Sequence, residues 1–161
     1  MLDIIQAKIQ TVDQAKATLA AKRISGAKVV FTNGCFDLLH TGHLHYLAEA
    51  RALGQCLVIG LNSDESVASL KGAHRPIKNE QSRALLLASL LFVDLVVVFS
   101  EDTPLQLITQ LKPDVLVKGG DYTEETVVGA KEVRAWGGDV QLLSFLPGYS
   151  TSKLEAKIKA S

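Results

Sequence analysis

Two histidines, His40 and His43, are the side chains in this chain whose type and spacing best suit chemistry. They stand three residues apart, beside Gly42. An apolar run typical of a buried strand, 27–31, precedes them, and an alanine- and leucine-rich helical segment, 44–53, follows. The stretch predicts a turn from a strand into a helix, where free N–H groups and the positive end of the helix dipole favour an anion. We therefore expect a phosphate-binding site at this turn.

The elements that must hold this turn in place are five apolar runs with the pattern of buried strands: 27–31, 56–61, 95–99, 114–117 and 140–145. Segments with helix-capping residues or terminal glycines separate these runs. Strands that alternate with helices predict a parallel sheet with helices on both faces. The expected fold class is therefore α/β, with three layers in the order α/β/α.

The first part of the chain, 1–26, comes before the strand that leads into the histidines. Thr11 and Gln14 form a capping-box pattern, which predicts a helix that packs beside the sheet. A length of 161 residues suits a single domain with its own core. We expect one domain over 1–161, with 1–26 as an N-terminal helical segment.

Composition excludes several classes of protein. Seventeen basic residues balance seventeen acidic ones, so no overall field attracts nucleic acid or an anionic membrane. No apolar run approaches the roughly 18 residues of a membrane-spanning helix, and the N-terminus lacks a signal pattern. The two cysteines, Cys35 and Cys56, form no disulfide framework. We expect a cytoplasmic protein without a nucleic-acid or membrane partner.

Six further blocks extend the pattern around the histidines. They are Leu70–Gly72, Arg75–Ile77, Glu101–Pro104, Lys118–Tyr122, Gly129–Val133 and Ser150–Ser152. Together with the His-x-Gly-His signature, they make the chain similar, from about Lys28 onward, to the nucleotidyltransferase superfamily. The Lys118–Tyr122 block resembles the branch of heptose 1-phosphate adenylyltransferases.

This resemblance implies a Rossmann-like five-stranded parallel sheet with the strand order 3-2-1-4-5. In that order the first and fourth strands are neighbours at the point where the strand order reverses, which is where open α/β sheets bind ligands. The turns after Phe31 and Val117 would then open into one crevice. The family also suggests a homo-oligomer.

The catalytic residues that the resemblance implies are His40, His43 and Lys71. Transfer of a nucleotidyl group depends mainly on positioning and on stabilising the charge of the phosphoryl oxygens, which suits imidazole and ammonium donors. The alternative for the histidines is a pair of helix caps, and the alternative for Lys71 is a solvated surface lysine.

A metal site made of Asp37, His40, His43 and His45 is a further alternative. On a helix that begins near Gly42, however, His45 faces away from His43. We expect no metal held directly by these side chains, and Mg²⁺ to arrive bound to the triphosphate of ATP.

Two groups of binding residues follow from the resemblance. The nucleotide-binding group is Phe31, Thr32, Asn33, Gly34, Cys35, Phe36, Gly42, Lys118, Gly119, Asp121, Ser150, Thr151 and Ser152. The sugar-phosphate group is Asp37, Arg75 and Arg83. For the two arginines a surface ion pair is the alternative, and for Ser150–Ser152 it is a simple helix cap.

The function that the resemblance implies is transfer of AMP from ATP to D-glycero-β-D-manno-heptose 1-phosphate, with release of pyrophosphate. Its product, ADP-heptose, would serve the inner core of lipopolysaccharide. One alternative is a CTP-dependent glycerol-3-phosphate cytidylyltransferase, a branch that usually carries an Arg-Thr-x-Gly-Ile-Ser-Thr block where this chain has 146–151. Another is a nucleotide-binding regulator without turnover.

Overall fold

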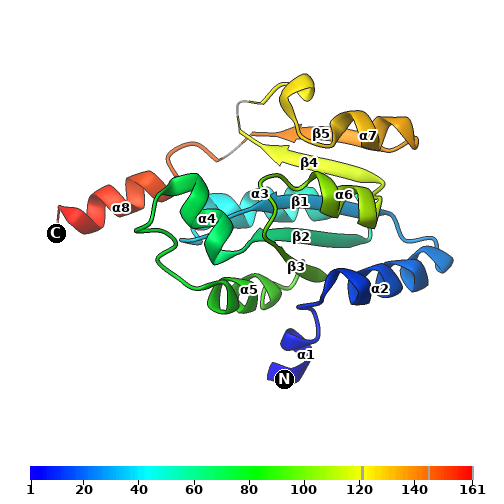
Figure 1. Ribbon diagram of the computed structural model, residues 1–161, viewed down its shortest axis with the longest axis horizontal. Helices are drawn as coiled ribbons and strands as arrows, with labels where there is room; N and C mark the ends of the chain where they lie inside the picture. Colours follow the sequence, from blue (N-terminus) through cyan, green and yellow to red (C-terminus); the bar gives the residue numbers. More distant parts are fainter. Residues whose placement is uncertain (121, 145, 161) are drawn as a thin grey trace.

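A parallel sheet of five strands runs through the centre of the molecule (Figure 1). In this computed structural model the description covers residues 1–120, 122–144 and 146–160, without the side chains of Ser152, Lys153 and Lys159. The strands are β1 (Val29–Gly34), β2 (Cys56–Asn62), β3 (Leu95–Phe99), β4 (Val115–Gly119) and β5 (Asp139–Leu143). Their spatial order, β3-β2-β1-β4-β5, confirms the Rossmann-like order expected from the sequence.

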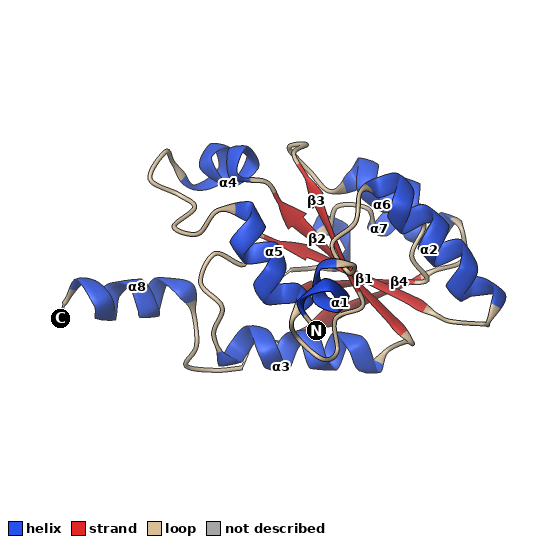
Figure 2. Cartoon of the chain, turned by 90° about the horizontal axis from the view of Figure 1, so that it is seen from below, coloured by secondary structure: helices blue, strands red, loops and turns tan. Residues whose placement is uncertain are grey.

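Helices connect the strands and cover both faces of the sheet (Figure 2). The bounds of the helices are α1 Leu2–Gln6, α2 Val12–Ile24, α3 Thr41–Ala52, α4 Asp64–Lys71, α5 Glu80–Ala88, α6 Leu105–Leu111, α7 Ala130–Ala135 and α8 Thr151–Lys159, with a 3₁₀ turn at Glu124–Thr126. In both views α8 projects from one end of the molecule.

The sheet separates two apolar cores because successive strand residues point to opposite faces. In β1, Val29 and Phe31 pack with α2, α6 and α7, whereas Val30 packs with α3 and α5. All three side chains are fully buried. The three-layer arrangement that strand–helix alternation predicts is therefore confirmed.

The N-terminal segment covers the edge of the sheet at β3. The predicted capping box is present, since Thr11 and Gln14 each bond the backbone N–H of the other and start α2. Just before it, the backbone at 8–10 pairs with Val96: Val96 N–H donates to the carbonyl of Lys8 at 2.8 Å, and Gln10 N–H donates to the carbonyl of Val96 at 3.0 Å. These bonds use polar groups that an edge strand otherwise exposes.

One local expectation needs correction. The strand expected at 27–31 continues to Gly34, because it keeps pairing with β2 as far as Leu61. Helix α6 begins at Leu105 with Pro104 in the cap position, and no side-chain cap bond forms there. Gly54 directly follows Leu53, the cap residue of α3, and close packing also requires a glycine there, since a Cβ would lie 2.6 Å from the carbonyl oxygen of Lys28.

No helix in the described part of the chain has both the length and the apolar character to cross a membrane.

Candidate active site

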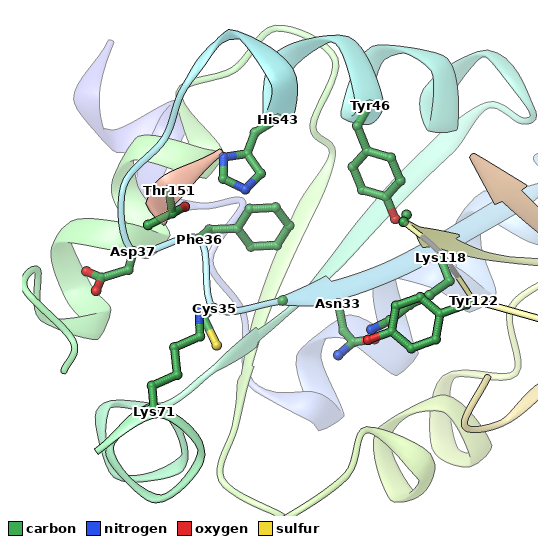
Figure 3. Close-up of a pocket in the computed structure, with 13 residues that line it drawn as sticks. Asn33, Cys35, Phe36, Asp37, His43, Tyr46, Lys71, Lys118, Tyr122 and Thr151 are labelled. Atoms are coloured by element: carbon green, nitrogen blue, oxygen red, sulfur yellow. The ribbon is translucent and has the colours of Figure 1, made fainter. Parts of the chain in front are cut away.

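A cavity of about 500 Å³ lies at the carboxyl ends of β1 and β4 (Figure 3). Its size lies within the range of small-ligand pockets. Ten of the residues that the sequence suggested for catalysis or binding line it: Asn33, Gly34, Cys35, Phe36, Asp37, His43, Lys71, Lys118, Gly119 and Thr151. The fold therefore brings together the turn after β1, the starts of α3 and α8, and the ends of α4 and β4.

The two histidines form a stacked pair at the start of α3. Their ring centroids lie 3.9 Å apart, and the Nδ1 atom of each ring is buried without a hydrogen-bond partner among the described residues. His40 occupies the cap position of α3 through its backbone, but its side chain makes no capping bond there. The helix-cap alternative therefore does not explain these side chains. A buried polar atom without a partner is unfavourable, which is typical of groups retained for function.

His43 is the histidine that lines the cavity, and its imidazole points into it (Figure 3). Burial, together with the neighbouring charges of His40 and Lys71, lowers the pKa of His43 to about 4. Burial also lowers the pKa of His40. Both imidazoles are therefore neutral at pH 7, and each can donate only one ring N–H. An anion in the cavity would favour protonation of these imidazoles.

The turn between β1 and α3 has a strained residue, Phe36, whose backbone φ is 46°. Residues other than glycine rarely adopt such an angle, and at binding sites it marks a conformation that the surroundings enforce. The Phe36 ring contacts His43 edge-on at 5.3 Å between centroids. It also covers Gly34, where a Cβ would lie 3.0 Å from the ring. Gly34 is thus needed for space above β1.

Two lysines bring positive charge to the cavity from opposite sides (Figure 3). Lys71 is the last residue of α4. Lys118, in β4, donates from Nζ to Oδ1 of Asn33 at 3.3 Å and lies 5.3 Å from the centroid of the Tyr122 ring. Burial lowers the pKa of Lys118. Their placement suits the phosphates of a nucleotide.

Asp37 borders the cavity, but its carboxylate is already engaged. It accepts from Arg75 Nη1 at 2.6 Å, from Ile77 N–H at 2.9 and 3.0 Å, and from Lys78 N–H at 3.0 Å. Burial alone would raise the pKa of Asp37, but these donors lower it below its usual value. Arg75 also pairs with Glu155 of α8. Asp37 and Arg75 therefore join the signature turn, the loop after α4 and the C-terminal helix.

Arg83 does not reach the surface of the cavity. It is fully buried, and its guanidinium donates to the carbonyls of Cys35, Asn62 and Lys78 and to Asp64. The sequence suggested that Arg83 contacts a sugar phosphate directly. In this structure its guanidinium instead links the turn at Cys35 to the carbonyls of Asn62 and Lys78 and so holds that turn in place.

Five other suggested residues are not among those that line the cavity. The side chain of Phe31 is in the core, Thr32 is buried beside Tyr46, and His40 stacks on His43. Gly42 lies against His40, and the carbonyl of Ser150 accepts from Leu154 N–H in the first turn of α8. Asp121 and the side chain of Ser152 lie outside the described residues.

Three residues that line the cavity lie outside the catalytic and binding groups named from the sequence: Tyr46, Gly120 and Tyr122. Tyr122 and Gly120 belong to the Lys118–Tyr122 block that resembles the family, so their place in this block could have identified them as binding residues. Tyr46 gave no such signal, because an aromatic residue on the inner face of a helix is typical of a core.

No group of three or more His, Cys, Asp or Glu side chains that could hold a metal ion occurs among the residues with described positions. The carboxylate at the cavity, Asp37, is occupied by N–H donors, while Lys71 and Lys118 add positive charge. This donor set fits an ion that enters with a triphosphate rather than one held by the protein alone.

Comparison with known proteins places the chain in a family. Residues 31–157 match the model of the cytidylyltransferase-like family. The bifunctional protein HldE of Geotalea uraniireducens is 55% identical over 95% of this chain, and HldE of Acidiphilium cryptum is 56% identical over 91%. The chain spans only 31% and 30% of the length of these two relatives.

Two solved structures resemble the fold. The lipopolysaccharide core biosynthesis protein of Thermoplasma volcanium matches with a TM-score of 0.61 and 28% identity, over 75% of this chain and 98% of that one. Pantoate-beta-alanine ligase of Francisella tularensis, at 15% identity and a TM-score of 0.62, covers 94% of this chain and 76% of its own and shows the fold alone. Because the family match includes the histidine turn, both strands of the cavity and most of α8, the chain belongs to the cytidylyltransferase-like family of nucleotidyltransferases.

Proposed function

We propose that this chain transfers the adenylyl group of ATP to a sugar 1-phosphate, D-glycero-β-D-manno-heptose 1-phosphate, with release of pyrophosphate. The observation that carries the proposal is the cavity at β1 and β4, where His43, Lys71 and Lys118 converge while the carboxylate of Asp37 is occupied by N–H donors. A site with two ammonium groups, and with no free carboxylate among the described residues that line it, suits two anionic substrates.

The chemistry follows from this arrangement. An oxygen of the sugar phosphate attacks the α-phosphorus of ATP, and the bond from that phosphorus to the β-phosphate oxygen breaks. Pyrophosphate carries away the electron pair. Lys71 and the imidazole of His43 would stabilise negative charge on the phosphoryl oxygens, and the amide groups at the start of α3 would add to this effect. Lys118 would bind the nucleotide. Mg²⁺ bound to the triphosphate would supply further charge neutralisation.

The start of α8 is the proposed clamp for the outer phosphates. Thr151 lines the cavity, and the start of a helix favours an anion through its N–H groups and dipole. Arg75 and Asp37 would then shape the acceptor side by holding the loop at 75–78 against the signature turn.

The choice of acceptor rests on the relatives and on the Lys118–Tyr122 block. The matched proteins are named HldE, and one structural neighbour is named a lipopolysaccharide core biosynthesis protein. The second name supports a role in lipopolysaccharide synthesis, and the Lys118–Tyr122 block, which resembles the heptose branch of the family, supports heptose 1-phosphate as the acceptor. We also propose a cytoplasmic location and an assembly of several copies, as the resemblance to the family suggests.

Release of pyrophosphate across a grid of substrates tests the proposal. ATP and CTP are each combined with heptose 1-phosphate and with glycerol 3-phosphate in the presence of Mg²⁺. Turnover with ATP and the heptose alone is expected. Turnover with CTP and glycerol 3-phosphate would instead identify the chain as a glycerol-3-phosphate cytidylyltransferase. Binding of ATP without turnover in any mixture would favour the regulatory alternative.

A further inference from the structure

The cavity exists because β1 and β4 part from each other. Strand β1 pairs with β2 from Val29 as far as Gly34, but its paired residues with β4 end at Phe31 and Leu116. Strand β4 nevertheless continues to pair with β5 as far as Gly119. The gap thus opens between two strands that are each supported on their other side, at the reversal of strand order where ligands bind.

Tyr46 of α3 crosses this gap just beyond the last paired residues. Its hydroxyl oxygen lies 2.5 Å from Oγ1 of Thr32 on β1 and 3.4 Å from the carbonyl oxygen of Val117 on β4. A tyrosine hydroxyl has one proton, so Thr32 donates to Tyr46 while Tyr46 donates to Val117. The Tyr46 side chain is almost completely buried, at 4% exposed, and points from α3 toward the strands (Figure 3).

A second link joins the next residue of each strand. Asn33 follows Thr32, Lys118 follows Val117, and their side chains meet at 3.3 Å. Tyr46, Asn33 and Lys118 all line the cavity. Side-chain contacts therefore replace backbone pairing at two successive residues of each strand. The contact made by Tyr46, at Thr32 and Val117, is the one nearest to the paired part of the sheet.

We propose that Tyr46 is a positioning residue for the nucleotide, because its hydroxyl bridge from Thr32 to Val117 sets the separation of β1 and β4 beneath the cavity. This inference rests on the proposed function, since it assigns the cavity to a nucleoside triphosphate. Tyr46 takes no part in the transfer itself. Loss of the bridge would let the strands shift and would alter the fit of Asn33 and Lys118 to the nucleotide.

The test is Tyr46→Phe, which keeps the ring and removes the hydroxyl. Calorimetry with ATP and with CTP, without an acceptor, measures affinity before any turnover. We expect the Kd for ATP to rise roughly three- to tenfold, the value of one net hydrogen bond, and the preference between ATP and CTP to narrow. We expect kcat at saturating ATP to change by less than about twofold, because the bridge does not touch the reacting atoms.

Thr32→Val breaks the same bridge from the other side. If the bridge acts as a unit, Thr32→Val and Tyr46→Phe together should weaken ATP binding no more than Tyr46→Phe alone. Additive losses would overturn the inference.

Trp136→Phe is the matched control for a general loss of stability. The Trp136 Nε1–H donates to the carbonyl of Pro113 at 3.0 Å, near the other end of β4, and Trp136 does not line the cavity. This variant should unfold more easily yet bind ATP like the parent. Equal weakening of ATP binding by both variants, or parental ATP binding by Tyr46→Phe, would overturn the inference alone. A parent chain that binds neither nucleotide would overturn the proposed function as well.

Discussion

His43 is the side chain on which the proposed reaction depends most, because it combines burial, a neutral imidazole and a position on the cavity wall. We expect His43→Ala to lower kcat by about 10²–10³, the usual cost of losing one donor to a developing charge. The chain should keep its fold, since the Nδ1 atom of His43 bonds to none of the described residues. Circular dichroism and steady-state pyrophosphate release measure the two effects.

His45→Ala is the control for this variant. His45 lies on the same helix with an exposed side chain, so its loss should leave turnover unchanged. Near-parental turnover by His43→Ala would contradict the assigned role.

The lowered pKa of His43 also predicts a dependence of stability on pH. In the unfolded chain a histidine takes up a proton near pH 6.5, whereas His43 in the folded chain does so only at about 4. Above pH 6.5 His43 is neutral in both the folded and the unfolded state, so its burial costs no stability through protonation. Between pH 6.5 and 4 only the unfolded state gains the proton, and the free energy of unfolding should fall by up to about 1.4 kcal/mol per pH unit.

Urea unfolding of His43→Gln and of the parent chain across this pH range measures that slope. The variant should lose less stability than the parent as the pH falls, and His45→Gln should behave like the parent. Parallel curves for His43→Gln and the parent would contradict the lowered pKa.

Residue types and spacing suggested a phosphate site at the histidine turn, and His43 lines the cavity. Lys71 and Lys118, which also line it, were suggested by the resemblance to the family, because a single lysine is by default a solvated surface residue. The partners of Arg83 could not be predicted, because the carbonyls of Cys35, Asn62 and Lys78 meet only in the folded chain. Tyr46 was missed since its hydroxyl, the only polar part of a core side chain, acts on two strands distant in sequence.

At the level of elements, α8 is held to the site by an ion pair near its first turn. Thr151 and Glu155 stand four residues apart and so share one face of the helix. Thr151 lines the cavity, while Glu155 pairs with the buried Arg75. The pair therefore fixes where the start of α8 meets the cavity.

We expect Glu155→Gln to raise the KM for ATP several-fold while kcat changes little, because the ion pair positions the proposed phosphate clamp and touches no reacting atom. Binding of AMP, which lacks the outer phosphates, should stay unchanged in calorimetry. Glu49→Gln, at an exposed position of α3, is the control. Equal weakening of ATP and AMP binding would argue against a clamp at α8.

The strands and most helices were predictable because their apolar runs and capping residues are local signals. The ends of elements were less so. Strand β1 extends to Gly34 because β2 offers partners as far as Leu61, and that partner strand begins 27 positions further along, at Cys56 opposite Val29. Gly54 closes α3, which its position in the sequence indicates, but its close approach to the carbonyl of Lys28, just before β1, arises only in the folded chain.

At the scale of the whole molecule, the N-terminal segment protects one margin of the sheet. Strand β3 ends the sheet order, and residues 8–10 pair with Val96 on its outer side. Removing residues 1–10 should expose those backbone groups and promote self-association beyond that of the parent chain.

Sedimentation velocity at several concentrations measures this association. A shorter deletion, of residues 1–6, removes α1 but keeps the pairing at 8–10, and it should sediment like the parent. If both deletions associate equally, the apolar side chains of α1 rather than the edge of β3 would be the cause.

The short pairing between β1 and β4 also has a consequence for the order of folding. Val30 and Val115 are 85 positions apart, whereas the paired residues Val30 and Leu57 are 27 apart and Val115 and Asp139 are 24 apart. Closing the longest loop costs the most chain entropy, and the backbone offsets it with two paired residues of each strand and the bond from Asp114 N–H to the carbonyl of Val29. We expect β1–β3 and β4–β5 to form before they dock. Recovery of nucleotide binding during refolding would then report the final docking step, after most secondary structure has already returned.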